Sequence, residues 1–176
     1  MKAITLWQPW ASLIACGAKK YETRSWYTNY RGKIAIHASK KKPPRQDEFD
    51  YEVFSAITGA LSKAYRGWRF DWWLGGHTVY PDGTYSGHAM PLGSIVAVAE
   101  LVGCRRMVTK GLNSGELGFY RIEGESVAFE TVTEEEKLFG DWQSGRYAWE
   151  LANVEELETP IPVKGAQGLW EWGADE

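Results

Sequence analysis

The sequence is poor in cysteine and lacks any long apolar run. Its 176 residues include two cysteines, Cys16 and Cys104, and neither lies in a spacing typical of a metal site. We therefore expect reduced thiols rather than a disulfide framework. No stretch approaches the roughly 18 apolar residues that a membrane span needs, and the first residues lack the apolar core of a secretory signal. These absences favour a cytoplasmic protein with no membrane partner.

Residues that bind metals or form catalytic sets are also scarce. Only three histidines occur, and His77 and His88 make no metal site without a third ligand. His37 is the best isolated acid–base candidate, but a histidine after a β-branched strand is more often structural. We find no Ser-His-Asp or Cys-His set at sequence positions that indicate a catalytic site. The sequence thus predicts no metal and no cofactor.

Positive charge is concentrated in the first quarter of a mildly acidic chain. The formal net charge is −3, yet ten of the twenty basic residues and one of the twenty-three acidic residues lie within residues 1–45. Such a segment can attract a polyanion locally. The alternative is that the basic and acidic parts of the chain neutralise each other in the fold.

The apolar pattern predicts an α+β fold in which strands dominate. A hydrophobic fraction of 44% and a charged fraction of 24% are ordinary for a globular protein, and the length suggests one domain. We expect strands over residues 3–6, 20–26, 31–38, 93–104 and 145–151, an extended segment over 160–163, and helices over 8–17, 46–64 and 134–139. A small mixed or antiparallel barrel fits this order best.

An unusual segment rich in tryptophan and glycine covers residues 67–91. A structureless loop of that length is uncommon in a compact domain. The segment therefore reads as an insertion, either a functional lid or a pair of small hairpins with Pro81-Asp82-Gly83-Thr84 as one tight turn.

The most informative motif is Gly17-Ala18-Lys19-Lys20-Tyr21-Glu22-Thr23-Arg24. In a strand, Glu22 and Arg24 point to one side and Thr23 to the other, while Lys19 stands at the turn before the strand. Lysine and arginine suit phosphate, a planar arginine can stack on a base, and a carboxylate can accept from an exocyclic amine. The alternative from spacing alone is a surface ion pair of little consequence.

This motif resembles that of the ASCH domain family, which lies within the PUA-like superfamily. Gln8-Pro9-Trp10 precedes it, Arg31-Gly32-x-Ile34-x-Ile36-His37 follows it, and residues 145–151 and 160–170 resemble the closing strands of bacterial and phage members. The resemblance covers residues 1–39 and about 93–172. It implies one domain over residues 1–176, with a PUA-like β-barrel, flanking helices and an insertion at about 67–91.

The family resemblance implies a nucleic-acid-binding module, specific for RNA or single-stranded DNA, whose cleft beside Lys19, Glu22 and Arg24 reads a modified base. Trp26 would stack on a base, although core packing is an equally good role for it. The residues that we expect to contact nucleic acid are Gln8, Lys19, Arg24, Trp26, Arg31, Lys40 and Lys41.

Two other functions remain open. Some members that resemble the family in fold are hydrolases: amidohydrolases that remove an acyl group from N4 of cytidine, and a ribonuclease. A hydrolase of this kind, acting on a modified nucleoside, would use Lys19 as base, Glu22 as proton shuttle and Arg24 beside them. In the amidohydrolases a threonine nucleophile follows the lysine by three positions, and here Glu22 stands there. The third possibility is a protein-interaction module that uses the Trp-rich insertion.

Overall fold

The computed structural model describes residues 1–65, 69–71, 77–79, 85–86, 90–110, 116–123 and 126–173. The chain divides into two compact units, and neither is a continuous segment. Unit 1 comprises residues 1–19, 33–99 and 153–176, and unit 2 comprises residues 20–32 and 100–152. The single domain expected over residues 1–176 stays a prediction.

Unit 1 is built on three short strands that join the two ends of the chain. Strand β1 (Lys2–Leu6) pairs in parallel with β3 (Gly32–Ala38) and antiparallel with β12 (Leu169–Glu171). Apolar side chains dominate β1 and β3 because both strands are buried in the middle of a sheet. The core there contains Ala3, Ala35 and Ile95, with Trp170 packed against it.

Two helices of unit 1 occur where the sequence predicts helical structure. Helix α1 (Trp10–Ala15) is almost entirely buried, and α2 (Tyr51–Ala64) follows its N-cap residue, Asp50. The single helix expected over 46–64 is wrong at its start, where a 3₁₀ turn, η1 (Gln46–Glu48), is separated from α2 by two extended residues. Phe49 is one of them, and its ring lies 6.1 Å from that of Trp10, so a tertiary contact interrupts the helix.

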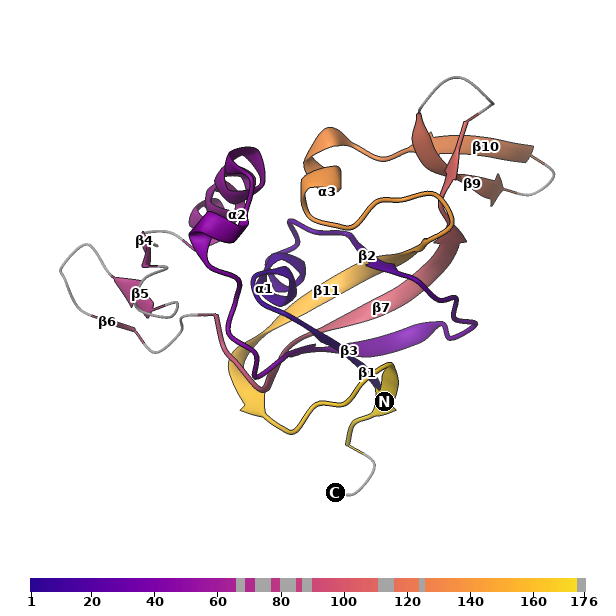
Figure 1. Ribbon diagram of the computed structural model, residues 1–176. Coiled ribbons are helices and arrows are strands. Elements are labelled where there is room, and N and C mark those ends of the chain that lie inside the picture. Colours follow the sequence, from indigo (N-terminus) through magenta and orange to yellow (C-terminus); the bar gives the residue numbers. More distant parts are fainter. Residues whose placement is uncertain are drawn as a thin grey trace. The chain divides into compact units, whose positions relative to one another are not determined.

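Two long strands contribute to both units. Strand β7 (Ser94–Arg106) is the predicted apolar strand, and β11 (Tyr147–Pro162) extends well beyond the predicted strand at 145–151. The strand order of the sheet is β12-β1-β3-β7-β11-β2 (Figure 1). Of the extended segment expected at 160–163, residues 160–162 form the C-terminal end of β11.

Unit 2 contains the strand of the Gly-x-Lys motif and a short acidic helix. Strand β2 (Tyr21–Arg24) pairs antiparallel with the start of β11, so that Arg24 is opposite Tyr147. Helix α3 (Glu134–Leu138) begins at Thr133, whose hydroxyl accepts the N–H of Glu136, as the sequence predicts.

A three-stranded sheet in unit 2 was not anticipated. It has the order β10-β9-β8 and consists of β8 (Val108–Thr109), β9 (Leu117–Glu123) and β10 (Ser126–Thr131). Phe119 from β9 is buried with Met107, Val132 and Ala148. Phe119 lies on the buried face of β9, whereas Tyr120 and Ile122 are exposed, so apolar residues do not mark one face of this strand in the sequence.

The insertion at 67–91 lies largely outside the described residues. Within it the structure describes β4 (Arg69–Asp71), β5 (His77–Val79) and β6 (Tyr85–Ser86), which pair antiparallel in that order. This is the hairpin arrangement that the sequence allowed. The turn at 81–84 and the tryptophans expected to serve a protein partner lie outside the described residues.

The α+β class predicted from the sequence is confirmed. None of the helices in the described ranges is long and apolar enough to cross a membrane.

Candidate functional site

The Gly-x-Lys motif begins in unit 1, where α1 ends. Gly17 has φ +76°, a left-handed backbone that favours glycine, and its N–H donates to the carbonyl of Ile14 at 2.9 Å. The N–H of Lys19 then donates to the carbonyl of Leu13 at 2.9 Å. Lys19 is 1% exposed, and lysine is almost never buried to this extent unless its ammonium group has a partner. The turn at the end of α1 thus places the side chain of Lys19 in the protein interior.

Glu22 and Arg24 lie in unit 2 on the same side of β2, as strand alternation predicts. Arg24 Nε lies 3.0 Å from Glu22 Oε1, and both side chains are mostly shielded from solvent. The sequence thus predicted correctly that these two side chains share one side of the strand, and their contact is the ion pair that was the alternative interpretation.

Thr23 of the same motif forms hydrogen bonds within unit 2. It is buried, and its hydroxyl oxygen accepts the backbone N–H of Asp141 at 3.0 Å. Arg146 donates to its carbonyl at 3.4 Å. These contacts favour a structural role for Thr23 and agree with the absence of a threonine where the amidohydrolases have one.

Glu136 positions the start of β2, and the sequence did not single it out. Its buried carboxylate accepts the backbone N–H of Tyr21 at 3.0 Å and that of Lys20 at 3.1 Å. The carbonyl of Lys20 accepts from Leu151. The only local signal is a run of three glutamates after Thr133, which looks like an ordinary acidic first turn.

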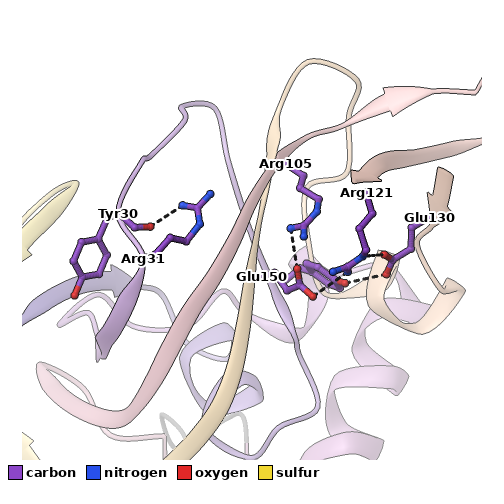
Figure 2. Close-up of polar contacts among 7 residues, drawn as sticks. Tyr30, Arg31, Arg105, Arg121, Glu130 and Glu150 are labelled. Atoms are coloured by element: carbon purple, nitrogen blue, oxygen red, sulfur yellow. Dashed lines mark hydrogen bonds and ion pairs between the residues drawn. The ribbon is translucent and has the colours of Figure 1, made fainter. Parts of the chain in front are cut away.

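Trp26 and Arg31 lie between β2 and β3 in unit 2. Trp26 is half-buried, and its ring meets Trp149 edge-on with centroids 4.6 Å apart. Arg31 is exposed, and one of its nitrogens donates to the carbonyl of Thr28 at 3.0 Å. The same nitrogen donates to the carbonyl of Tyr30 at 2.7 Å (Figure 2). The contact with Trp149 supports the packing role for Trp26, whereas Arg31 keeps donors that face solvent.

Gln8 and His37 in unit 1 make internal contacts. Gln8 is 0% exposed, its amide oxygen accepts the N–H of Ser12, and its amide nitrogen donates to the carbonyl of Pro91. The ring nitrogens of His37 lie 3.2 Å from Thr5 Oγ1 and 3.1 Å from the carbonyl of Val163. Burial lowers the pKa of His37. The side chains of Gln8 and His37 therefore stabilise the fold, and we assign neither residue a contact with a ligand.

Lys40, Lys41 and Lys42 form an exposed basic turn in unit 1 after β3. The N–H of Ser39 donates to the carbonyl of Leu6 at 2.8 Å, and the N–H of Lys41 donates to Ser39 Oγ at 3.0 Å. Within the described residues, none of these three lysines forms a salt bridge, although many of the other cationic side chains do. This turn is therefore a concentration of uncompensated positive charge.

A charge network links β7, β9, β10 and β11 in unit 2 (Figure 2). Glu150 accepts from Arg105 at 2.9 Å and from Arg121 at 3.0 Å, and Arg121 also donates to Glu130 at 2.6 Å. The Tyr21 hydroxyl donates to Glu130 at 3.3 Å. Arg121 holds the pKa of Glu130 below its usual range. The charges of the two arginines and the two glutamates in this network neutralise one another. The network therefore stabilises the fold rather than attracting a ligand.

Neither a metal site nor a reactive thiol emerges from the part of the chain that the structure describes. No group of three potential ligands from His, Cys, Asp and Glu is found there. Cys16 and Cys104 are free, and burial raises the pKa of both thiols. A raised pKa disfavours the thiolate that a nucleophile or a metal ligand requires.

The α+β fold, with its mixed sheet and a Gly-x-Lys turn directly after α1, is that of a PUA-like domain. The model of one family in this class, the ASCH domain, matches residues 4–161, and the chain belongs to the ASCH domain family. A segment of 44 residues is 50% identical to activating signal cointegrator 1 of Homo sapiens and 48% identical to that of Mus musculus. This segment covers 25% of the chain and 8% of each relative.

Proposed function

We propose that this ASCH domain is a nucleic-acid-binding module that contacts RNA or single-stranded DNA. The observation that carries the proposal is the exposed turn of Lys40, Lys41 and Lys42, which lacks carboxylate partners among the described residues. Uncompensated lysines bind a phosphate backbone through release of its counterions. The basic first quarter of the chain and membership of a family regarded as nucleic-acid-binding support the same function.

Arg24 and Arg31 would add contacts to the phosphates or to a base edge. Arg31 has N–H groups beyond those used in the contacts described above. Glu22 beside Arg24 supplies an acceptor for an exocyclic amine, which is the chemistry needed to read one base, including a modified one. Reduced cysteines accord with action in the cytoplasm.

The test is a fluorescence-anisotropy titration of labelled single-stranded and duplex RNA and DNA at two salt concentrations. We expect salt-sensitive binding to at least one single-stranded ligand. The double variant Lys40→Gln/Lys42→Gln should weaken it and reduce the magnitude of the log–log salt slope by about 1.4, at ~0.7 for each lost phosphate contact.

The matched control is Lys63→Gln/Lys164→Gln, which removes two exposed lysines from other parts of unit 1. Equal weakening by both double variants would show that net charge alone governs binding. Failure of the unmodified protein to bind any of the four nucleic acids would overturn the proposal.

A second candidate function, hydrolysis of a modified nucleoside, is favoured by the burial of Lys19. A lysine that is 1% exposed stands at the position where the resembling amidohydrolases have theirs. Buried lysines commonly serve as bases because their environment alters proton affinity. In this candidate function, Lys19 activates a water.

Chromatography of N4-acylated cytidine incubated with the protein tests this function. Release of the acyl group that Lys19→Met abolishes would support a hydrolase, provided that circular dichroism shows the variant folded. Unchanged substrate after long incubation with the unmodified protein would exclude that substrate class.

A further inference from the structure

Trp7 is an exposed tryptophan at the junction of β1 and α1, and the sequence analysis assigned it no role. It is 46% exposed, although both of its chain neighbours, Leu6 and Gln8, are buried. Tryptophan is large and apolar, so this exposure sacrifices hydrophobic stabilisation that burial would give. An exposed ring between two buried residues indicates a side chain held for contact with something outside the chain.

The backbone on both sides of Trp7 is fixed. The carbonyl of Leu6 accepts the N–H of Ser39, and the carbonyl of Trp7 accepts the N–H of Ala11 at 3.2 Å. The side chain of Gln8 bonds to Ser12 and to the carbonyl of Pro91. The ring is thus presented from a rigid element, which reduces the entropy lost when a ligand binds.

Lys41 covers one face of the ring. Its ammonium nitrogen lies 3.2 Å from the centroid of the Trp7 ring. The bond between Ser39 and Leu6 ties the basic turn to the end of β1, so the aromatic surface and the lysines belong to one rigid part of unit 1. A cation–π contact at an exposed site is worth about 0.5–1 kcal/mol, less than the ~1–3 kcal/mol of a base stacked on an aromatic ring.

We propose that Trp7 is a stacking surface for one unpaired base, and that Lys41 leaves the ring to bind an adjacent phosphate when the base arrives. This inference rests on the proposed nucleic-acid binding and specifies its ligand as single-stranded. A duplex keeps its bases stacked on one another, so it cannot offer a base face to Trp7 without paying for unstacking. Lysines beside an aromatic ring match the alternation of phosphate and base along a single strand.

The experiment compares two labelled ligands by fluorescence anisotropy: a short oligoadenylate and an abasic oligomer of the same length. The unmodified protein should bind the oligoadenylate about fivefold or more tightly than the abasic oligomer. Trp7→Ala should abolish this preference by weakening oligoadenylate binding alone, and Trp7→Phe should retain most of it. Lys41→Gln should weaken binding of both ligands.

Tyr51→Ala is the matched control, because Tyr51 is an aromatic residue of unit 1 that is 84% exposed. It should leave both affinities unchanged, and thermal unfolding should show each variant folded. Equal weakening of both ligands by Trp7→Ala, or no weakening at all, would overturn stacking on Trp7 while leaving nucleic-acid binding intact. Failure of the unmodified protein to bind either ligand would overturn both proposals.

Discussion

The backbone N–H of Tyr21 donates a hydrogen bond of 3.0 Å to a side-chain oxygen of Glu136, which lies 115 residues further along the chain. The same carboxylate also accepts the N–H of Lys20. Glu136 thus holds the first residues of β2, the strand that carries Glu22 and Arg24. A buried carboxylate on two backbone donors is strongly favoured because hydrogen bonds to a charged group are stronger than neutral ones.

Replacement of Glu136 should therefore destabilise unit 2. We expect Glu136→Ala to lower the free energy of unfolding by about 1.5–3 kcal/mol, the range for hydrogen bonds to charged groups. Glu136→Gln, which keeps one acceptor oxygen, should cost less. Urea unfolding provides the measurement. The control Glu135→Ala lies in the same helical turn but is exposed, and should cost about 0.5 kcal/mol or less. Equal costs for Ala at both positions would contradict the role of Glu136.

The second prediction concerns alkaline pH. Burial, together with the negative charges of Glu150 and Glu130, raises the pKa of Tyr21 from 10.0 to about 12. Between these two values the unfolded tyrosine loses its proton while the folded one keeps it, so the folded state binds more protons and its stability falls as pH rises. Urea unfolding at about pH 9 and about pH 11 should show a loss of stability that is smaller in Tyr21→Phe. Parallel losses in both proteins would argue against the shift.

The third prediction compares two glycines. A Cβ on Gly118 in β9 would lie 2.1 Å from the carbonyl oxygen of Glu130, whereas one on Gly59 in α2 would meet nothing within 4 Å. Gly118→Ala should destabilise the protein by about 1–3 kcal/mol because the β10 backbone must move. Gly59→Ala should stabilise it by about 0.5–1 kcal/mol because alanine loses less entropy in a helix. Thermal unfolding tests both, and a stabilising Gly118→Ala would refute the close approach.

The fourth prediction separates the two proposed functions at Glu22. Glu22→Gln removes the negative charge that lies 3.0 Å from Arg24 Nε. In a binding module, the released positive charge of Arg24 should maintain or increase affinity for an unmodified single strand by up to about tenfold, ~1.4 kcal/mol. In a hydrolase that uses Glu22 for proton transfer, turnover should fall by about 100-fold or more. Anisotropy and product chromatography on the same preparation distinguish the outcomes, and weaker binding with unchanged turnover would contradict both assignments.

The sequence predicted the elements whose signals are local. The apolar run of β7 and the Thr133 cap of α3 occur as expected, because each depends on neighbouring residues alone. The break between η1 and α2 was missed because the ring of Phe49 packs on Trp10, a contact between distant parts of the sequence. The length of β11 was also missed, because the expected strand ended at residue 151 and the prolines at 160 and 162 disfavour a central strand.

The distinction between local signals and contacts between distant residues also explains which parts of the candidate site the sequence predicted. The placement of Glu22 and Arg24 on one side of the strand follows from strand alternation, and the sequence predicted it. The role of Glu136 depends on a helix more than a hundred residues away, so spacing gave no indication of it. Trp7 was overlooked because the exposure of a tryptophan between apolar and helical residues is decided by tertiary packing. We expected Gln8 to contact the ligand because its side chain is polar. In the structure this side chain forms its hydrogen bonds inside the fold.

The pairing of β1 with β12 has a consequence for how the chain folds. Lys2 is opposite Glu171, and the amino group of Met1 donates to the carbonyl of Trp172 at 2.6 Å. One edge of β1 therefore stays uncovered until β12 has been synthesised. Pairings of such high sequence separation slow folding, because closing a long loop costs entropy before any contact forms. On a ribosome, β1 would emerge long before β12, which leaves this edge of β1 open to other strands until β12 has been made.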